Sequence, residues 1–353
     1  MAPDWRALYA SNQAKIQAAI PASDKLHRPS MTTLALAPNL PAVPRAGRLP
    51  TSGAAGSRPL IYVPRRLDPL TPVPLVCMLH GCTQDPAGFA AATAMNDAAD
   101  CHGFVVVYPA QDRGGNPQGC WNWFLPAHQR RGTGEPAAIA RIVVDLIQTN
   151  SQCTIDRRRV YVAGLSSGGA MAAILAACYP DVFAAVAVHS GLAYSSASDL
   201  ASAFGVMAQG GGDAEVLGHA AHAAMGEHSR PLPSIVIHGS TDRTVAPANA
   251  IHVLRQSMTA NHLAAPDRCD HDVTRPTTSW HGQVQGGHPY TRSHWNDNQG
   301  ALMHELLDID GLGHAWSGGV AGGSYTDPRG PSATEAIWTF FDRCASRTGE
   351  TGA

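Results

Sequence analysis

The sequence has few charged side chains and almost no net charge. Charged residues make up 15% of the 353 residues, the formal net charge is -2, and no run rich in Lys and Arg occurs. Proteins that bind nucleic acid or an anionic membrane surface usually carry a basic patch that attracts the negative charges of the partner. The sequence therefore predicts no nucleic-acid partner and no membrane partner.

Long apolar runs are also missing. No stretch reaches the roughly 18 apolar residues that a membrane-spanning helix needs. The first residues, 1–6, are not followed by the apolar segment of a signal peptide. We therefore expect no signal peptide in this chain, and the localisation stays open between the cell interior and a secreted mature form.

The spacing of cysteine and histidine matches no metal site. The eight cysteines include no C-x-x-C pair, and His219 and His222 lack flanking ligands, so we interpret these two as surface histidines. Eight cysteines allow many disulfide connectivities, so spacing alone assigns no pairs. We expect no metal ion and no cofactor.

Short apolar runs alternate with helical patterns along the chain. Runs rich in Val and Ile are typical of parallel strands covered on both faces. They occur at 60–63, 75–79, 104–108, 160–163, 184–188 and 234–238, and helical patterns occur at 136–148, 168–178 and 332–344. This alternation predicts an α/β fold with a mostly parallel central sheet and helices on both faces.

The remaining segments suggest a single catalytic domain. Two extended runs, 290–295 and 301–309, are joined by a Gly-containing turn, which predicts a hairpin. Two stretches, 111–133 and 192–233, are predicted to be rich in loops and are candidates for the walls of a binding cleft. We find no internal repeat and no linker. We expect an N-terminal arm at 1–55, one catalytic domain at 56–348 and a short tail at 349–353.

The chemistry is indicated by the motif G-x-S-x-G at residues 164–168. It directly follows the apolar run 160–163 and precedes a helical pattern that begins near Ser167. A strand, a sharp turn and a helix are the setting of a nucleophile elbow in the α/β-hydrolase fold. We therefore predict that Ser166 is a nucleophile, with Gly164 and Gly168 leaving room for close packing around it.

A serine hydroxyl needs a base, and the base needs an acid that orients it. In α/β-hydrolases these follow the serine in the order acid, then histidine. His314 stands in a Gly-rich loop after the last predicted strand, and Asp242 follows the strand at 234–238. We predict that His314 is the base and Asp242 the acid.

Asp308 and Asp310 compete with Asp242 for the role of the acid, because both lie closer in sequence to His314. The acid must reach the imidazole nitrogen that faces away from the serine. A carboxylate in the loop after the preceding strand can reach that position. We expect Asp308 to point along the sheet and Asp310 to cap the turn at Gly311.

Two backbone amides are candidates for an oxyanion hole. One is the amide of Ser167, which directly follows the nucleophile, and the other should come from the loop after the strand at 75–79. In that loop Gly81 permits a tight backbone that would aim the amide of Cys82 at the reacting carbonyl. We interpret His80 as a residue that shapes the loop.

Four motifs in order resemble the polyhydroxybutyrate depolymerase family of esterases, which has feruloyl and acetylxylan esterases as relatives. The motifs are LHGCTQ at 79–84, CWNWF at 120–124, GLSSGGAM at 164–171 and GHAWSGG at 313–319. The resemblance covers about residues 58–345. It implies hydrolysis of carboxylic esters without a metal or cofactor, and Ser166, Asp242 and His314 match the family's triad positions.

The resemblance also suggests a disulfide between Cys82 and Cys120, because both flank family motifs; the alternative is two free thiols. Trp121, Trp123 and Trp316 are candidates for lining the cleft, although aromatic residues more often pack in cores.

The expected substrate is a small-molecule or polymeric ester, of a hydroxyalkanoate or of the feruloyl or acetylxylan type. A catalytically silent binding module and an acyltransferase are the alternatives. The first would be expected to lack a triad residue, and none is missing. The second would share the triad. Nothing in the sequence indicates the oligomeric state.

Overall fold

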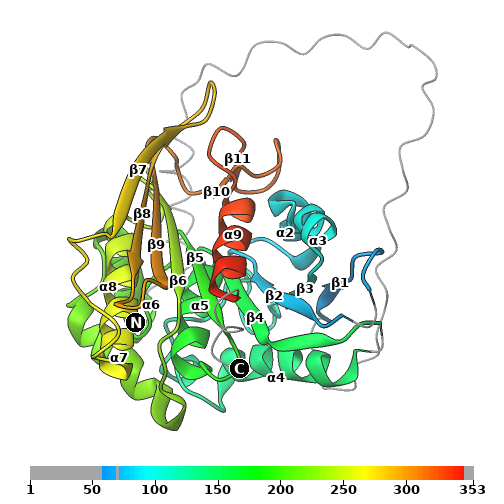
Figure 1. Ribbon diagram of the computed structural model, residues 1–353, viewed down its shortest axis with the longest axis horizontal. Coiled ribbons are helices and arrows are strands. Elements are labelled where there is room, and N and C mark those ends of the chain that lie inside the picture. Colours follow the sequence, from blue (N-terminus) through cyan, green and yellow to red (C-terminus); the bar gives the residue numbers. More distant parts are fainter. Residues whose placement is uncertain (1–57, 69–70, 151, 346–353) are drawn as a thin grey trace. The chain divides into compact units, whose positions relative to one another are not determined.

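A computed structural model of the chain describes residues 58–68, 71–150 and 152–345 (Figure 1). The predicted arm at 1–55 and tail at 349–353 lie outside the described residues, so those domain boundaries stay predictions. The described residues contain a nine-stranded sheet with the order β1-β3-β2-β4-β5-β6-β9-β8-β7. The strands are β1 (Leu60–Tyr62), β2 (Val73–Leu79), β3 (Val105–Tyr108), β4 (Ile155–Leu165), β5 (Ala185–His189), β6 (Ser234–Gly239), β7 (Thr278–Gln283), β8 (Pro289–Asn296) and β9 (Leu302–Ile309).

The central strands are parallel, and their carboxyl ends meet at one edge of the sheet. β3, β2, β4, β5, β6 and β9 pair in parallel, whereas β1, β8 and β7 pair antiparallel at the two sides. The register pairs Leu79 with Gly164, Leu165 with His189, and Gly239 with Ile309. Residues that directly follow these strands are therefore neighbours in space, although they are far apart in the sequence.

Helices cover both faces of this sheet. One hydrophobic cluster joins the sheet to α4 (Gly134–Thr149), α5 (Ser167–Cys178), α6 (Leu200–Gln209), α7 (Ala214–Met225) and α8 (Ala248–Ala264). A second cluster joins the other face to α2 (Pro86–Thr93), α3 (Met95–His102) and α9 (Ala333–Ala345). Successive residues of β2, Leu75 and Val76, belong to different clusters because side chains alternate across a strand. The predicted fold class is confirmed.

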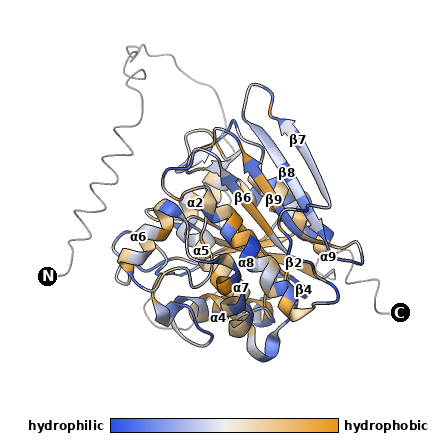
Figure 2. Ribbon diagram, turned by 90° about the vertical axis from the view of Figure 1, so that its left-hand side faces the viewer, coloured by the Kyte–Doolittle hydropathy of each residue, from blue (hydrophilic) through white to orange (hydrophobic). Residues whose placement is uncertain are grey.

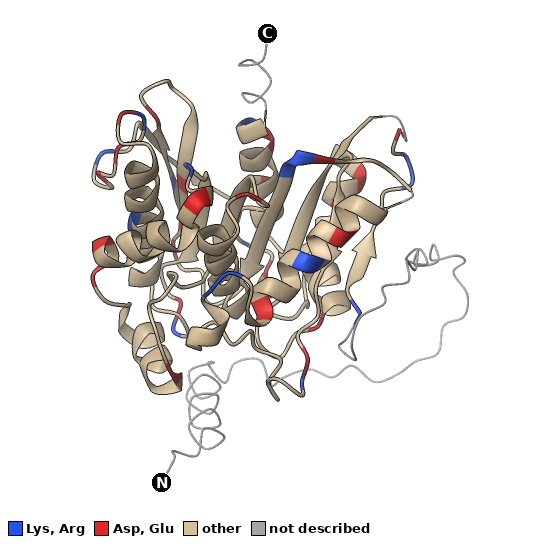
Figure 3. Ribbon diagram, turned by 90° about the horizontal axis from the view of Figure 1, so that it is seen from below, with Lys and Arg blue, Asp and Glu red and all other residues tan. Residues whose placement is uncertain are grey.

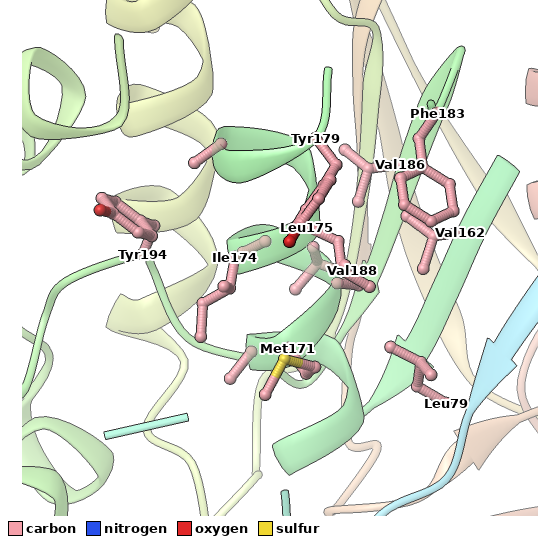
Figure 4. Close-up of a cluster of buried hydrophobic side chains, with 14 of the residues drawn as sticks. Leu79, Val162, Met171, Ile174, Leu175, Tyr179, Phe183, Val186, Val188 and Tyr194 are labelled. Atoms are coloured by element: carbon pink, nitrogen blue, oxygen red, sulfur yellow. The ribbon is translucent and has the colours of Figure 1, made fainter. Parts of the chain in front are cut away.

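The helix α5 lies almost entirely inside the first cluster (Figure 4). Its side chains Met171 and Leu175 are buried in the same cluster as Val162 of β4 and Val188 of β5. Burying one such side chain stabilises a fold by roughly 1.5–3 kcal/mol relative to leaving it exposed. This packing fixes the helix, and with it the turn that precedes the helix, against the sheet.

One predicted loop region is wrong. The stretch 192–233 contains α6 and α7, which begin at caps formed by Asp199 and Asp213. Alanine and glycine gave this stretch a weak apolar pattern, but they allow close helix packing: a Cβ at Gly218 would lie 2.4 Å from Thr259 of α8. The stretch 111–133 does lack long elements, with only the short helix η2 (Pro126–His128).

The predicted strands and the hairpin are confirmed, with two additions. β4 begins earlier than its apolar run, at Ile155, and the charged residues 156–159 extend it. β7 was not predicted, because its six residues, TSWHGQ, are mostly exposed and form no apolar run. Figure 2 shows β7 in hydrophilic colours beside the more apolar inner strands.

Charged residues of both signs are interspersed along the described chain (Figure 3). Several form local ion pairs, such as Arg131 with Asp181 at 2.7 Å. Exposed pairs of this kind contribute about 0–1 kcal/mol each, so the apolar clusters account for most of the stability. In the ranges that the structure describes, no helix combines the length and apolar character needed to cross a membrane.

Candidate active site

Ser166 stands on a strained turn between β4 and α5. Its φ is +58° and its ψ is -119°, a conformation that a residue with a side chain rarely adopts. The Ser166 amide donates to the carbonyl of His189 at 2.9 Å, and the Ser166 carbonyl accepts from Ala170 at 2.9 Å. Such strain persists only where the surroundings hold it, and it is frequent at functional sites.

Two glycines allow the turn to pack this tightly. A Cβ at Gly164 would lie 2.2 Å from the carbonyl oxygen of Gly168, and a Cβ at Gly168 would lie 2.1 Å from that of Leu79. Both distances are far below van der Waals contact. The close packing predicted for the glycines of the G-x-S-x-G motif is thus present.

Asp242 and His314 lie beyond the ends of β6 and β9, at the same edge as Ser166. His314 Nδ1 is 2.7 Å from Asp242 Oδ2, and both side chains are largely buried. When Nδ1–H donates to the carboxylate, Nε2 is left free to accept a proton. Within the described residues no hydrogen bond joins His314 to Ser166 Oγ, and such contacts are often long in proteins without substrate.

His314 and backbone donors keep the Asp242 carboxylate in its ionised form. Its Oδ1 accepts hydrogen bonds from the amides of Thr244 and Val245, each at 2.9 Å. Burial raises the pKa of Asp242, but the charge and hydrogen bond of His314, the charge of His238 and the hydrogen bond from the Val245 amide outweigh burial and lower the pKa below its usual range. The carboxylate therefore keeps its charge beside the imidazole.

The competing carboxylates have other partners. Asp308 lies in β9, opposite His238 of β6, and burial raises its pKa. Asp310 accepts from Ser240 Oγ at 2.8 Å. The expected cap of Asp310 on Gly311 is wrong: Ser240 Oγ accepts the Gly311 amide at 2.9 Å, so Asp310 acts on that turn only through the serine.

A buried histidine links the loop of His314 to the sheet. His189 Nε2 accepts the amide of Ser317 at 3.1 Å, and the His189 carbonyl accepts the amide of Ser166. Burial, followed by the charges of neighbouring histidines, lowers the pKa of His189 to about 3. His189 thus bonds the segment after β9 through its neutral side chain and the segment after β4 through its backbone carbonyl.

The loop at 80–84 lies beside the serine. A Cβ at Gly81 would be 3.5 Å from Ser166 Cβ, and Cys82 Sγ is 3.5 Å from Ser167 Oγ. Cys82 forms a disulfide with Cys120, so the pairing suggested by the family resemblance is confirmed. Neither the Cys82 amide nor the Ser167 amide has an acceptor among the described residues. Both donors are therefore available to a bound group.

Comparison with known protein families gives a match. The family described as "Esterase PHB depolymerase" matches residues 60–271, which is more than half of the chain. The chain belongs to the PHB depolymerase family of esterases. The family resemblance is thereby confirmed: three of the four motifs lie within the matched residues, and the motif at 313–319 lies outside them.

Curated relatives of this PHB depolymerase family member include a depolymerase, acetylxylan esterases and feruloyl esterases. Poly(3-hydroxyalkanoate) depolymerase C of Paucimonas lemoignei is 36% identical over 68% of this chain and 54% of its own length. Probable acetylxylan esterase A of Neosartorya fischeri is 33% identical over 58% of this chain and 56% of its own length. The chain spans about half the length of these relatives.

A solved structure shows the same fold. Acetyl xylan esterase from Aspergillus awamori superposes with a TM-score of 0.62 at 23% identity, over 81% of this chain and 93% of that chain. Similarity at this low identity concerns the fold alone, and it supports the α/β-hydrolase fold of this family member.

The three tryptophans that were candidates for the cleft are buried. Trp316 is 1% exposed, stacks on His189 and donates from Nε1 to Thr334. Trp121 is 2% exposed and donates from Nε1 to the carbonyl of His80, and Trp123 is 5% exposed. Their burial favours the packing role, which was the alternative at these positions.

Two residues near the site were missed in the sequence. Gln84 accepts the Gly81 amide at 2.9 Å and donates to the carbonyl of Ser324 at 2.9 Å, which joins the loop at 80–84 to the loop after His314. Tyr325 contacts the His314 ring. Gln84 lies inside a family motif and could have been noticed, whereas Tyr325 carries no local sequence signal. No group of three or more metal-binding side chains occurs in the described ranges.

Proposed function

We propose that this chain is a carboxylic-ester hydrolase that forms an acyl-enzyme on Ser166. One observation carries the proposal. A serine on a strained turn before a helix follows β4, and a buried Asp–His pair at 2.7 Å lies after β6 and β9, so all three residues lie at the carboxyl edge of the parallel strands. Family membership supports the same conclusion.

In the first step Ser166 Oγ attacks the ester carbonyl while His314 Nε2 takes its proton. Asp242 holds the opposite nitrogen of the ring and stabilises the imidazolium that forms. The bond to the alcohol oxygen then breaks, and His314 returns the proton to that oxygen. The alcohol departs and the acyl group stays on the serine.

The amides of Cys82 and Ser167 are the proposed donors to the carbonyl oxygen as it becomes an oxyanion. Ser167 is the first residue of α5, where the helix dipole adds a partial positive charge. Removing one such donor usually costs about 10²–10³ in turnover. Water then attacks the acyl-enzyme with His314 as base, and the acid is released.

The proposed substrates are esters of hydroxyalkanoates, as the name of the Paucimonas lemoignei relative suggests. The names of other relatives make acetylated xylan and feruloyl esters the second candidate. No feature of the described residues favours a silent binding module, because all three residues of the proposed triad are present.

The test is a substrate panel with product analysis. The purified chain would be assayed with p-nitrophenyl esters of increasing acyl length, methyl ferulate, acetylated xylan and hydroxybutyrate oligomers. The proposal predicts release of acid and alcohol, with hydroxybutyrate oligomers among the substrates. No hydrolysis of any ester would refute the hydrolase, and formation of new esters in preference to acid would favour an acyltransferase.

A further inference from the structure

Tyr325 lies against the imidazole of His314 and remains open to solvent. The two ring centroids are 6.2 Å apart and the rings are nearly perpendicular, at 81°. Tyr325 is 37% exposed, whereas the His314 side chain is 9% exposed. The tyrosine thus forms an accessible aromatic surface directly beside a nearly covered histidine.

The backbone holds Tyr325 in this position at some cost. Its φ is +53°, in the left-handed region that residues with side chains seldom adopt. The Tyr325 carbonyl accepts the amide of Trp316 at 2.7 Å, where β10 (Trp316–Ser317) pairs with β11 (Thr326–Asp327). The preceding residue, Ser324, is held by Gln84. A strained residue kept by contacts on both sides is more frequent at functional sites than elsewhere.

These contacts place Tyr325 close to the reacting atoms. Gln84 also accepts the amide of Gly81, and a Cβ at Gly81 would be 3.5 Å from Ser166 Cβ. Tyr325 therefore belongs to a loop that is hydrogen-bonded to the loop at 80–84 and also contacts His314.

The proposed reaction places the alcohol part and the acyl part of an ester at different positions in the site. His314 gives its proton to the alcohol oxygen, so the alcohol part must lie next to the imidazole when the bond breaks. The acyl carbonyl lies instead between Ser166 and the amides of Cys82 and Ser167. An exposed ring that contacts the imidazole is therefore within reach of the alcohol part of a bound ester.

We propose that Tyr325 forms the subsite for the alcohol part of the ester and selects alcohols with an extended apolar group. This inference rests on the proposed esterase function. The ring offers apolar area to a carbon chain or a ring in the leaving group, and it makes no such contact with methanol, which is too small.

The test measures how much of one acyl-enzyme reacts with water and how much reacts with an added alcohol, and it compares different alcohols. By microscopic reversibility, an alcohol that attacks the acyl-enzyme enters through the subsite by which the leaving alcohol departs. The chain would be incubated with p-nitrophenyl butyrate and either methanol or 1-butanol, and the ratio of new ester to butyric acid would be measured. This ratio comes from the active molecules only, so partial unfolding of a variant does not change it.

The variants are Tyr325→Phe, Tyr325→Ala and, as a control, Val216→Ala, an exposed apolar residue on α7. Tyr325→Ala should lower the butanol ratio on the order of tenfold and the methanol ratio by less than about twofold, since the loss of one apolar contact changes selectivity by this order. Tyr325→Phe keeps the ring and should match the wild type, as should Val216→Ala.

A second readout covers the case in which water outcompetes both alcohols. The ratio of kcat/KM for butyl butyrate to kcat/KM for methyl butyrate should fall by the same factor in Tyr325→Ala. Equal ratios in Tyr325→Ala and wild type, or an equal loss for both alcohols, would overturn the subsite while leaving the esterase intact. A wild-type chain that releases no p-nitrophenol would refute the proposed function and the subsite together.

Discussion

Asp242 differs from its competitors in the groups that surround its carboxylate. It accepts two backbone amides and faces His314 Nδ1 at 2.7 Å, whereas Asp310 bonds Ser240 and Asp308 lies within the sheet. Sequence proximity favoured Asp308 or Asp310, but the parallel register of β6 and β9 brings the residues that follow these strands together. The position of a carboxylate relative to a strand end is therefore more informative than its distance along the chain.

Asp242→Asn should lower kcat for p-nitrophenyl butyrate on the order of 10⁴-fold, because the amide favours the wrong tautomer of His314. The control variants Asp308→Asn and Asp310→Asn should change kcat by less than about tenfold, since these residues lie outside the proposed proton path. Circular dichroism would verify that each variant is folded. A larger loss in Asp308→Asn than in Asp242→Asn would contradict the assignment of the acid.

At the scale of elements, the turn between β4 and α5 depends on the absence of two side chains. Gly168→Ala would put a Cβ 2.1 Å from the carbonyl oxygen of Leu79, which cannot move without shifting β2. We expect a loss of about 3 kcal/mol or more in the free energy of unfolding, as overpacking against backbone is poorly relieved. Urea denaturation measures this directly.

Gly205→Ala in α6 is the matched control, because a Cβ there meets nothing within 4 Å. This exchange should stabilise the protein by about 0.5–1 kcal/mol, since alanine loses less backbone entropy in a helix. Similar urea midpoints for the two variants would show that close approach at Gly168 is not needed.

Local sequence patterns predicted the central strands of the sheet. They missed the edge strand β7 and the helices α6 and α7. Runs such as 75–79 are apolar on both sides because helices cover both faces, and this gives a clear signal. β7 is exposed and polar, so its pairing with β8 has no local signature. The helices α6 and α7 were hidden by alanine and glycine, whose apolar pattern is weak.

In the candidate site, too, some residues could be predicted from local sequence and others could not. Ser166, Asp242 and His314 could be proposed from the sequence because each lies in the segment that follows a predicted strand. Tyr325 could not, since its contact with His314 depends on how the loop between β9 and α9 folds back through β10 and β11. Contacts that arise from tertiary folding alone leave no periodic or spaced pattern in the sequence.

At the scale of the whole molecule, buried neutral histidines make stability depend on pH. Burial lowers the pKa of His304 to about 3; the side chain is within hydrogen-bond distance of Ser234 at 2.9 Å and of Asn261 at 3.2 Å. Below about pH 6.5, His304 binds a proton in the unfolded chain but stays neutral in the folded protein. The free energy of unfolding should therefore fall as the pH decreases from about 6.5 toward 3, by up to about 1.4 kcal/mol per pH unit for this residue.

His304→Gln tests this contribution, because glutamine can bond Ser234 and Asn261 but takes no proton. The substitution also alters packing at every pH, so the quantity compared is the difference in unfolding free energy between pH 7 and pH 5. That difference should be smaller in His304→Gln than in the wild type, and unchanged in His219→Gln, which alters an exposed histidine of α7. An equal difference in all three proteins would contradict a neutral buried His304.

The central claim is that Ser166 is the nucleophile of an ester hydrolase, and covalent labelling tests it most directly. A p-nitrophenyl alkylphosphonate reacts as the ester does but leaves a stable adduct on the attacking atom. We predict release of one equivalent of p-nitrophenol and a phosphonate adduct that tandem mass spectrometry localises to Ser166, with neither in Ser166→Ala. An adduct on another residue, or equal labelling of Ser166→Ala, would contradict the account.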